Sequence, residues 1–199
     1  MPKENKTLIK TLNAFLKLLE KKDFDSISVT EIVNECGFSR QNFYKNFASK
    51  QVFIREIFLY DFKRGIEEEY VFRFRYSSKI IMSCLEEHKS FYKAVLKSEN
   101  DEFLFRLIRE YSFVILNSFV EYSAFKANEE QIRAIEFFVN GLTATVLMWL
   151  SEKTTYSPDD VSVILSANIP PCLSFFITEE EEITSDYLLY KIRKRGDVW

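Results

Sequence analysis

Apolar residues recur at a helical period along most of the chain. Near the N-terminus they follow one another at intervals that place them on one face of a helix. The residues on this face are Leu8, Leu12, Phe15, Leu16 and Leu19. The pattern predicts a first helix over residues 6–22. Because the whole chain holds only four glycines and four prolines, a β-rich or disordered protein is disfavoured and an all-α fold is predicted.

Two short helices separated by a glycine are predicted next. Ser28 is followed three residues later by Glu31, which is the capping-box pattern that begins a helix. Gly37 readily adopts the left-handed backbone conformation that ends one. Ser39 can then cap a second helix. A short helix, a tight turn and another short helix are typical of a helix-turn-helix.

The second of these helices is predicted to have two different faces. Phe43 and Phe47 lie four residues apart and are expected to face inward. At about 100° per residue, Gln41 and Lys45 point away from the two phenylalanines. The helix would therefore present amide and cationic side chains outward while its aromatic side chains anchor it.

Helical periodicity continues beyond this motif, with breaks expected near residues 75–78 and 86–90. The sequence is therefore divided into an N-terminal three-helix domain with the helix-turn-helix, residues 1–50, and a C-terminal helical domain, residues 51–199.

One helix of the C-terminal part is unusually apolar. The helix expected over residues 129–153 is apolar on nearly all sides in its second half, so it must be covered on two sides. Its own core would cover one side and a second subunit the other. This helix and the helix that follows Pro158 would together form the dimer contact. An internal core helix without a partner is the alternative. No fold is predicted for the tail after Pro171.

Charge is unevenly distributed along the chain. The net charge is −3, but residues 1–50 carry nine Lys and Arg against six Asp and Glu, a net charge of +3, which leaves −6 on the remainder. A cationic N-terminal part on an acidic body is consistent with a local DNA contact.

Several classes of protein are disfavoured by what the sequence contains. Three scattered cysteines and a single histidine indicate neither a metal site nor a disulfide framework. Phosphate-binding loops and glycine-rich cofactor motifs are not found, so neither an enzyme nor a cofactor is predicted. The N-terminus is polar, and the apolar run "TATVLMWL" is shorter than a membrane span. We therefore expect a cytoplasmic protein without a membrane partner.

The segment "VTEIVNECGFSRQNFYKNFASK", residues 29–50, resembles the DNA-binding domain of the TetR family of transcriptional regulators. The shared features are an early threonine, the glycine of the turn, a tyrosine and a closing phenylalanine, and a final Ser-Lys. The later segment "FFVNGLTATVLMWLSEKTTYSPDDV" resembles the dimerisation helices of a subgroup that includes coactivator-type regulators of dihydroxyacetone kinase genes. The tail after Pro171 departs from the family pattern.

Side-chain chemistry and this resemblance point to the same DNA contacts. Arginine can pair bidentately with guanine, and glutamine or asparagine with adenine, whereas lysine and hydroxyl groups typically hold phosphates. The predicted DNA-binding residues are Thr30, Ser39, Arg40, Gln41, Asn42, Tyr44, Lys45 and Lys50. The resemblance further implies a homodimer that binds a palindromic operator in double-stranded DNA and represses transcription.

Regulation by an apolar or aromatic small-molecule effector is also implied by the resemblance. The candidate lining residues, for each of which an ordinary core position is the commoner role, are Phe58, Phe62, Phe72, Tyr92, Phe103 and Tyr111. The alternative is a coactivator-type regulator that responds to a partner protein. An enclosed aromatic cavity would favour the metabolite, and a filled helical body would favour the protein partner.

Overall fold

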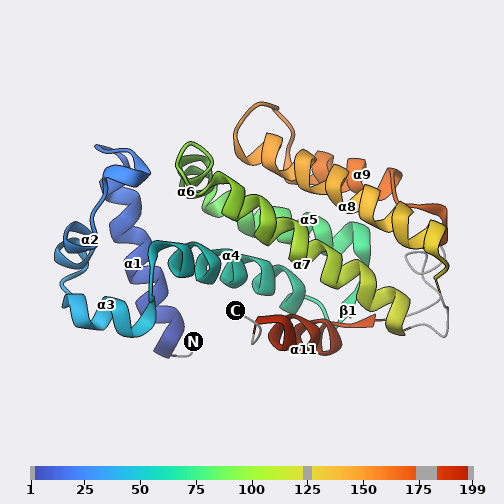
Figure 1. Ribbon diagram of the computed structural model, residues 1–199, viewed down its shortest axis with the longest axis horizontal. Coiled ribbons are helices and arrows are strands. Elements are labelled where there is room, and N and C mark those ends of the chain that lie inside the picture. Colours follow the sequence, from blue (N-terminus) through green and yellow to red (C-terminus); the bar gives the residue numbers. More distant parts are fainter. Residues whose placement is uncertain (1–2, 123–126, 174–182, 197–199) are drawn as a thin grey trace. The chain divides into compact units, whose positions relative to one another are not determined.

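A computed structural model of the protein describes residues 3–122, 127–173 and 183–196 (Figure 1). The described elements are α1 (Lys3–Leu19), the 3₁₀ turn η1 (Phe24–Ser26), α2 (Val29–Cys36), α3 (Arg40–Asn46), α4 (Lys50–Glu67), β1 (Val71–Phe72), α5 (Phe74–Glu87), α6 (Lys89–Val95), α7 (Asp101–Tyr122), α8 (Glu129–Leu150), α9 (Pro158–Ala167), β2 (Ile183–Thr184) and α11 (Ser185–Gly196). The predicted all-α fold is confirmed.

The chain forms two compact units. The first unit contains residues 1–60 and 88–104, and the second contains residues 61–87 and 105–199. The helix-turn-helix is therefore grouped with the first part of α4 and with α6, which comes forty residues later in the sequence.

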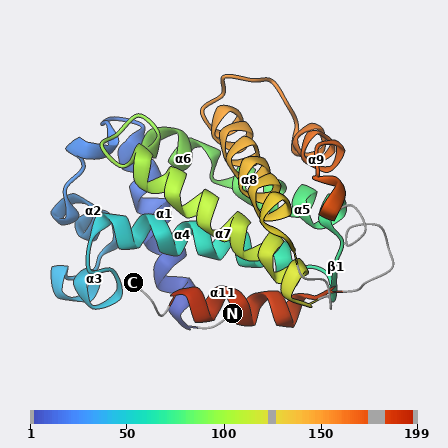
Figure 2. The same cartoon turned by 45° about the vertical axis from the view of Figure 1, so that its right-hand side comes forward.

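The first unit is built around phenylalanine rings. In this unit α1 packs against α2 and α6, and α2 packs against α3 (Figure 2). The Phe15 ring of α1 lies 4.9 Å from the Phe24 ring of η1 and 5.7 Å from the Phe53 ring of α4, measured between centroids. Phe91 of α6 completes the cluster, with its ring centroid 5.8 Å from those of both Phe15 and Phe53. Because all four rings are buried, this cluster joins four elements in one core.

The ends of α2 and α3 lie where local sequence signals predict them. Ser28 and Glu31 form the predicted capping box at the start of α2. Gly37 has φ = 66°, a left-handed conformation that side chains other than glycine rarely adopt, and it ends that helix. The Ser39 hydroxyl accepts a hydrogen bond from the Asn42 N–H at 3.1 Å and so begins α3. The first helix is shifted by three residues from its predicted bounds, since it runs over Lys3–Leu19.

In the second unit α9 packs against α5 and α8 (Figures 1 and 2). Gly65, near the end of α4, allows close approach to α5, because a Cβ atom placed on it would lie 2.5 Å from the Ile81 Cα atom. The break predicted near residues 75–78 is wrong: those residues belong to α5, and the chain instead leaves the helical conformation after Glu67. The break predicted near residues 86–90 is confirmed by the boundary between α5 and α6.

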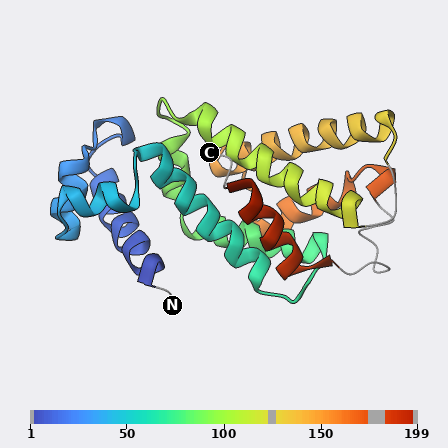
Figure 3. The ribbon, with the colours of Figure 1, turned by 60° about the horizontal axis from the view of Figure 1, so that its bottom comes forward.

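The segment for which no fold was predicted contributes to the second unit. Strand β2 pairs antiparallel with β1, so that Thr184 lies opposite Val71 and Ile183 opposite Phe72. Helix α11 follows directly and is the dark red helix in Figure 3. It buries three apolar side chains, those of Leu188, Leu189 and Ile192. The described residues 183–192 are thus part of the core of the second unit.

Helix α8 is the one helix, among the described residues, whose length and composition would allow it to cross a membrane. Its most apolar window has a mean hydropathy of 1.2, and 39% of that window is buried. Length and composition are weak grounds for a membrane span, because core helices of soluble proteins share them. The exposed apolar side chains of α8 include Phe137, which is 82% exposed, and Met148.

Candidate nucleic-acid interface

Helix α3 is fixed to the first unit by aromatic side chains. Phe43 and Phe47 are 2% and 4% exposed, which confirms that both face inward. Their ring centroids lie 5.3 Å apart, and the Phe53 ring of α4 lies 6.3 Å from the first and 5.1 Å from the second. The short helix is therefore stabilised by packing against a cluster of aromatic rings as well as by its own hydrogen bonds.

The opposite side of α3 is polar and open to solvent. Arg40, Gln41, Tyr44 and Lys45 are exposed, and Tyr44 packs the edge of its ring against Phe43. Arg40 and Lys45 have no acidic partner among the residues that the structure describes, so both cations are available to phosphate or base oxygens. This is the chemistry that a DNA-reading helix needs.

Asn42 lies at the edge of this face and is half-buried. The Asn46 amide donates hydrogen bonds to the Asn42 backbone oxygen at 2.7 Å and to its Oδ1 atom at 3.1 Å. Asn46 was not among the predicted site residues. Its position four residues after Asn42 is the signal that could have identified it, since side chains at this spacing meet on a helix.

Thr30 and Ser39, the two residues whose hydroxyl groups were predicted to contact DNA, differ in the hydrogen bonds that they form within the protein. Thr30 is exposed in the first turn of α2. The Ser39 oxygen already accepts from the Asn42 N–H, so its role in capping α3 leaves the hydroxyl proton to donate to another acceptor.

Lys50 is held by the protein itself. Its Nζ atom donates to the backbone oxygens of Phe24 at 3.0 Å and Asp25 at 3.4 Å, and it lies 5.3 Å from the centroid of the Phe24 ring. Burial lowers the pKa of its ammonium group, and the nearby carboxylates of Asp25 and Glu31 oppose that effect. In this structure Lys50 therefore ties the start of α4 to η1, a role that sequence reasoning missed.

Lys17 and Lys22 of the first unit are paired with carboxylates. Lys17 pairs with Glu35 at 3.1 Å, and Lys22 pairs with Glu31. The hydrogen bond from Lys22, followed by those from Ser28, lowers the pKa of Glu31 to about 2. These pairs leave less positive charge for DNA than the lysine count of the N-terminal part suggests.

The six candidate effector residues are divided between the two units. Phe58, Tyr92 and Phe103 belong to the first unit, whereas Phe62, Phe72 and Tyr111 belong to the second. Five of the six are buried, and Phe103 is half-buried.

Several of these aromatic side chains pack against other rings. The Phe62 and Tyr111 rings lie 6.0 Å apart, and the Phe72 ring lies 5.8 Å from that of Phe119. These contacts are typical of an aromatic core.

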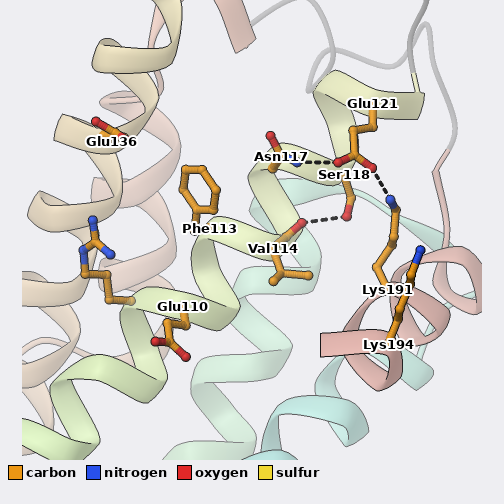
Figure 4. A pocket seen from close by; sticks show the side chains of 10 residues that line it. Glu110, Phe113, Val114, Asn117, Ser118, Glu121, Glu136, Lys191 and Lys194 are labelled. Atoms are coloured by element: carbon orange, nitrogen blue, oxygen red, sulfur yellow. Dashed lines mark hydrogen bonds and ion pairs between the residues drawn. The ribbon is translucent and has the colours of Figure 1, made fainter. Parts of the chain in front are cut away.

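Other residues line the cavities. A groove of about 520 Å³ runs along α7 in the second unit, and Figure 4 shows Glu136 of α8 and Lys191 and Lys194 of α11 at its edges. Lys191 pairs with Glu121, which also accepts a hydrogen bond from the Asn117 amide. This groove is polar at its rim and is lined by none of the six candidate residues.

A second groove, of about 560 Å³, lies between α8 and α9 and is mainly apolar. A third, of about 470 Å³, lies in the first unit beside α1, η1 and α6. The six candidate effector residues line neither of them.

Comparisons with known proteins agree with this arrangement. Residues 12–57 match the family model described as bacterial regulatory proteins of the tetR family, and residues 77–170 match a model described as a transcriptional regulator C-terminal region. No significant match was found among proteins with curated descriptions.

Solved structures share the fold. The chain is similar to the dihydroxyacetone kinase operon activator DhaS, with a TM-score of 0.59 and 17% identity over 85% of this chain and 96% of that one. It is also similar to a tetR-family transcriptional regulator from Streptomyces coelicolor, with a TM-score of 0.55 and 15% identity over 94% of this chain and 89% of that one.

The two family models match in succession, first on the helix-turn-helix and then on the helical body, and the fold agrees with both. The chain therefore belongs to the TetR family of transcriptional regulators, which act by binding DNA and not by catalysis.

Proposed function

We propose that the protein is a homodimer that binds a palindromic operator through the exposed face of α3 and represses transcription from it. The observation that carries this proposal is the contrast between the two faces of α3. Its buried phenylalanines fix the helix, while Arg40, Gln41 and Lys45 point to solvent. A helix held in this way can enter the major groove without losing much conformational freedom. The cytoplasm, where the DNA lies, is the proposed location.

The residues of the interface have different proposed roles. Arg40 and Gln41 read base edges, because guanidinium and amide groups can form two hydrogen bonds to guanine and adenine respectively. Thr30 and Lys45 hold phosphates and so fix the register of the protein on the duplex. Asn42 reads a base once Asn46 has oriented its amide.

The exposed side of α8 and α9 supports the homodimer. Phe137 is 82% exposed, and it borders the apolar groove between the two helices. Gly141 opens this surface further, since a Cβ atom placed on it would meet nothing within 4 Å. A two-fold axis through this surface would pair two α3 helices, which calls for half-sites one helical turn or more apart.

An apolar or aromatic small molecule is the proposed effector, and release from the operator is its proposed effect. A protein partner is the second candidate. It is favoured by the burial of the aromatic residues that were expected to line an effector pocket, because they pack against other rings. The name of DhaS shows that a regulator of this fold can be an activator. Transcription of a reporter under the selected operator, with and without the protein, separates repression from activation.

Selection of bound duplexes from a random pool tests the proposed reading of bases by α3. The wild-type protein should select a palindromic site. The Gln41→Ala protein should lose the preference at one position of each half-site, at a cost of about 1–3 kcal/mol for that base pair. Asn140→Ala, which removes an exposed amide from α8 of the second unit, is the matched control and should select the wild-type site. An unchanged site for Gln41→Ala would contradict the assignment.

A further inference from the structure

Lys10 of α1 lies beside the turn of the helix-turn-helix. Its Nζ atom is 4.6 Å from the centroid of the Phe38 ring. Phe38 stands between Gly37, which ends α2, and Ser39, which caps α3. The backbone of α1 is also close to this point, because the Cys36 thiol donates to the Lys10 carbonyl oxygen at 3.7 Å. The ammonium group is therefore placed next to the start of α3.

Lys10 differs from Lys17, Lys22 and Lys50 in what its ammonium group contacts. Lys17 and Lys22 pair with carboxylates, and Lys50 binds two backbone oxygens. For Lys10, by contrast, no carboxylate lies within ion-pair distance among the described residues, and its contact is the face of an aromatic ring. A ring attracts a cation without cancelling its charge, so Lys10 keeps a full positive charge at an exposed position.

The position of this charge relative to α3 suggests what it meets. In a helix-turn-helix the N-terminal residues of the recognition helix contact the base edges, so the start of that helix lies within the major groove. A side chain that flanks the start of the helix then lies near the edge of the groove, where the phosphates run. Lysine is a common phosphate ligand at such positions.

We propose that Lys10 binds a backbone phosphate of the operator and that α1 is therefore part of the DNA-binding surface. The inference rests on the proposed entry of α3 into the major groove. The Phe38 ring holds the ammonium group in place before DNA binds, which reduces the side-chain freedom lost on binding. Because a phosphate carries no sequence information, the contact adds affinity for every duplex alike.

The salt dependence of DNA binding tests the proposal. Fluorescence anisotropy would measure the affinity of the full-length protein for a duplex with the selected site and for an unrelated duplex, over a series of salt concentrations. Lys10→Gln should weaken binding to both duplexes by a similar factor. It should also reduce the slope of log K against log salt by about 0.9, the value expected for one lost phosphate contact. Lys10→Arg should keep the wild-type slope.

Lys21→Gln is the matched control. It changes the net charge equally. Lys21 is exposed and lies beyond the end of α1, whose last residue, Leu19, is roughly 13 Å from Lys10 along the helix. Its salt slope should equal that of the wild type. Thermal melting of each variant would verify that the fold is retained.

Two outcomes would overturn the inference. One is a wild-type slope for Lys10→Gln, and the other is an equal reduction for Lys10→Gln and Lys21→Gln, which would indicate only the general field of the protein. Failure of the proposed function would look different, because the wild-type protein would then select no DNA site at all.

Discussion

The carboxylate of Glu31, in the first turn of α2, binds both Lys22, which precedes the helix, and Ser28, which caps it. It accepts hydrogen bonds from Lys22, from the Ser28 N–H and from the Ser28 hydroxyl, and its pKa falls from 4.5 to about 2. A carboxylate with a lowered pKa stabilises the folded state fully above its ordinary pKa, and this contribution is lost as the pH falls toward the folded value.

We therefore expect a pH-dependent effect of Glu31→Gln. The variant should melt at a lower temperature than the wild type at neutral pH, and the gap should close as the pH falls from about 4.5 to about 2. Circular dichroism melts across this range would measure it. Glu20→Gln, which removes another exposed carboxylate, should show no comparable closing gap. A constant gap for Glu31→Gln would contradict the role of the ionised carboxylate.

Substitutions of Lys50 and Lys45 should differ in their effect on stability, because Lys50 binds the protein itself and Lys45 is free to contact DNA. Lys50→Ala removes the donor to two backbone oxygens, so unfolding should become easier by about 1.5–3 kcal/mol, and DNA affinity should fall as well. Lys45→Ala removes an exposed cation and should lower DNA affinity while the melting temperature is retained. Denaturant titration and anisotropy would measure both quantities, and an unchanged stability for Lys50→Ala would refute the link to η1.

At this scale the local features could be predicted from the sequence. The capping hydrogen bonds join residues only a few positions apart, so the spacing in the sequence alone indicates the helix ends. The residues concerned are Ser28, Glu31, Gly37 and Ser39. The bond from Lys50 to the Phe24 oxygen spans 26 residues. Such a contact depends on how the elements pack, and no period in the sequence reveals it.

Among the elements, α6 is connected to α3 through aromatic rings of the first unit. The Phe91 ring touches those of Phe15, Phe24 and Phe53, and Phe53 in turn touches both anchoring phenylalanines of α3. A rigid chain of packed rings thus connects α6 to the recognition helix within the first unit.

Phe91→Leu should loosen this support. We expect a loss of stability of about 1–2 kcal/mol, because leucine fills the space of the ring incompletely, and a fall in DNA affinity of several-fold. Phe119→Leu is the matched control, since Phe119 is equally buried but belongs to the second unit. It should lower stability similarly and leave affinity unchanged, as measured by melts and anisotropy. Equal effects of the two variants on affinity would show that only overall stability matters.

Helix boundaries were predictable where a cap or glycine marks them and failed where polar residues enter a helix. The break expected near residues 75–78 rested on the polar run Arg75–Ser78, but Ser77 and Ser78 are buried in α5. The Ser77 hydroxyl accepts from the Arg73 N–H at 3.0 Å, and the Ser78 hydroxyl donates to the Arg75 oxygen at 3.0 Å. Because the hydroxyls of these serines form their hydrogen bonds within the first turns of α5, the serines do not interrupt the helix.

For the whole molecule, the exposed apolar side of α8 and α9 is the surface that we propose a second subunit covers. Phe137→Asp places a charge on this surface and should convert the proposed dimer to monomers. Light scattering after size exclusion would measure the mass, and binding to a two-half-site duplex should weaken at least tenfold. Tyr190→Asp, at an exposed tyrosine of α11, should remain dimeric. A monomeric wild-type protein, or a dimeric Phe137→Asp protein, would contradict the proposed interface.

The pairing of β1 with β2 bears on the order in which the protein can be completed during translation. Ser185 hydrogen-bonds to the Glu69 oxygen, 116 residues earlier in the chain. A nascent chain emerges from its N-terminus at about 5–20 residues per second, so the first unit has all its residues once position 104 has left the ribosome. The partner strand of β1 and the buried leucines of α11 arrive many seconds later. Until then, the nascent polypeptide exposes an unpaired strand edge and uncovered apolar side chains, which are the features that make incomplete chains prone to aggregation.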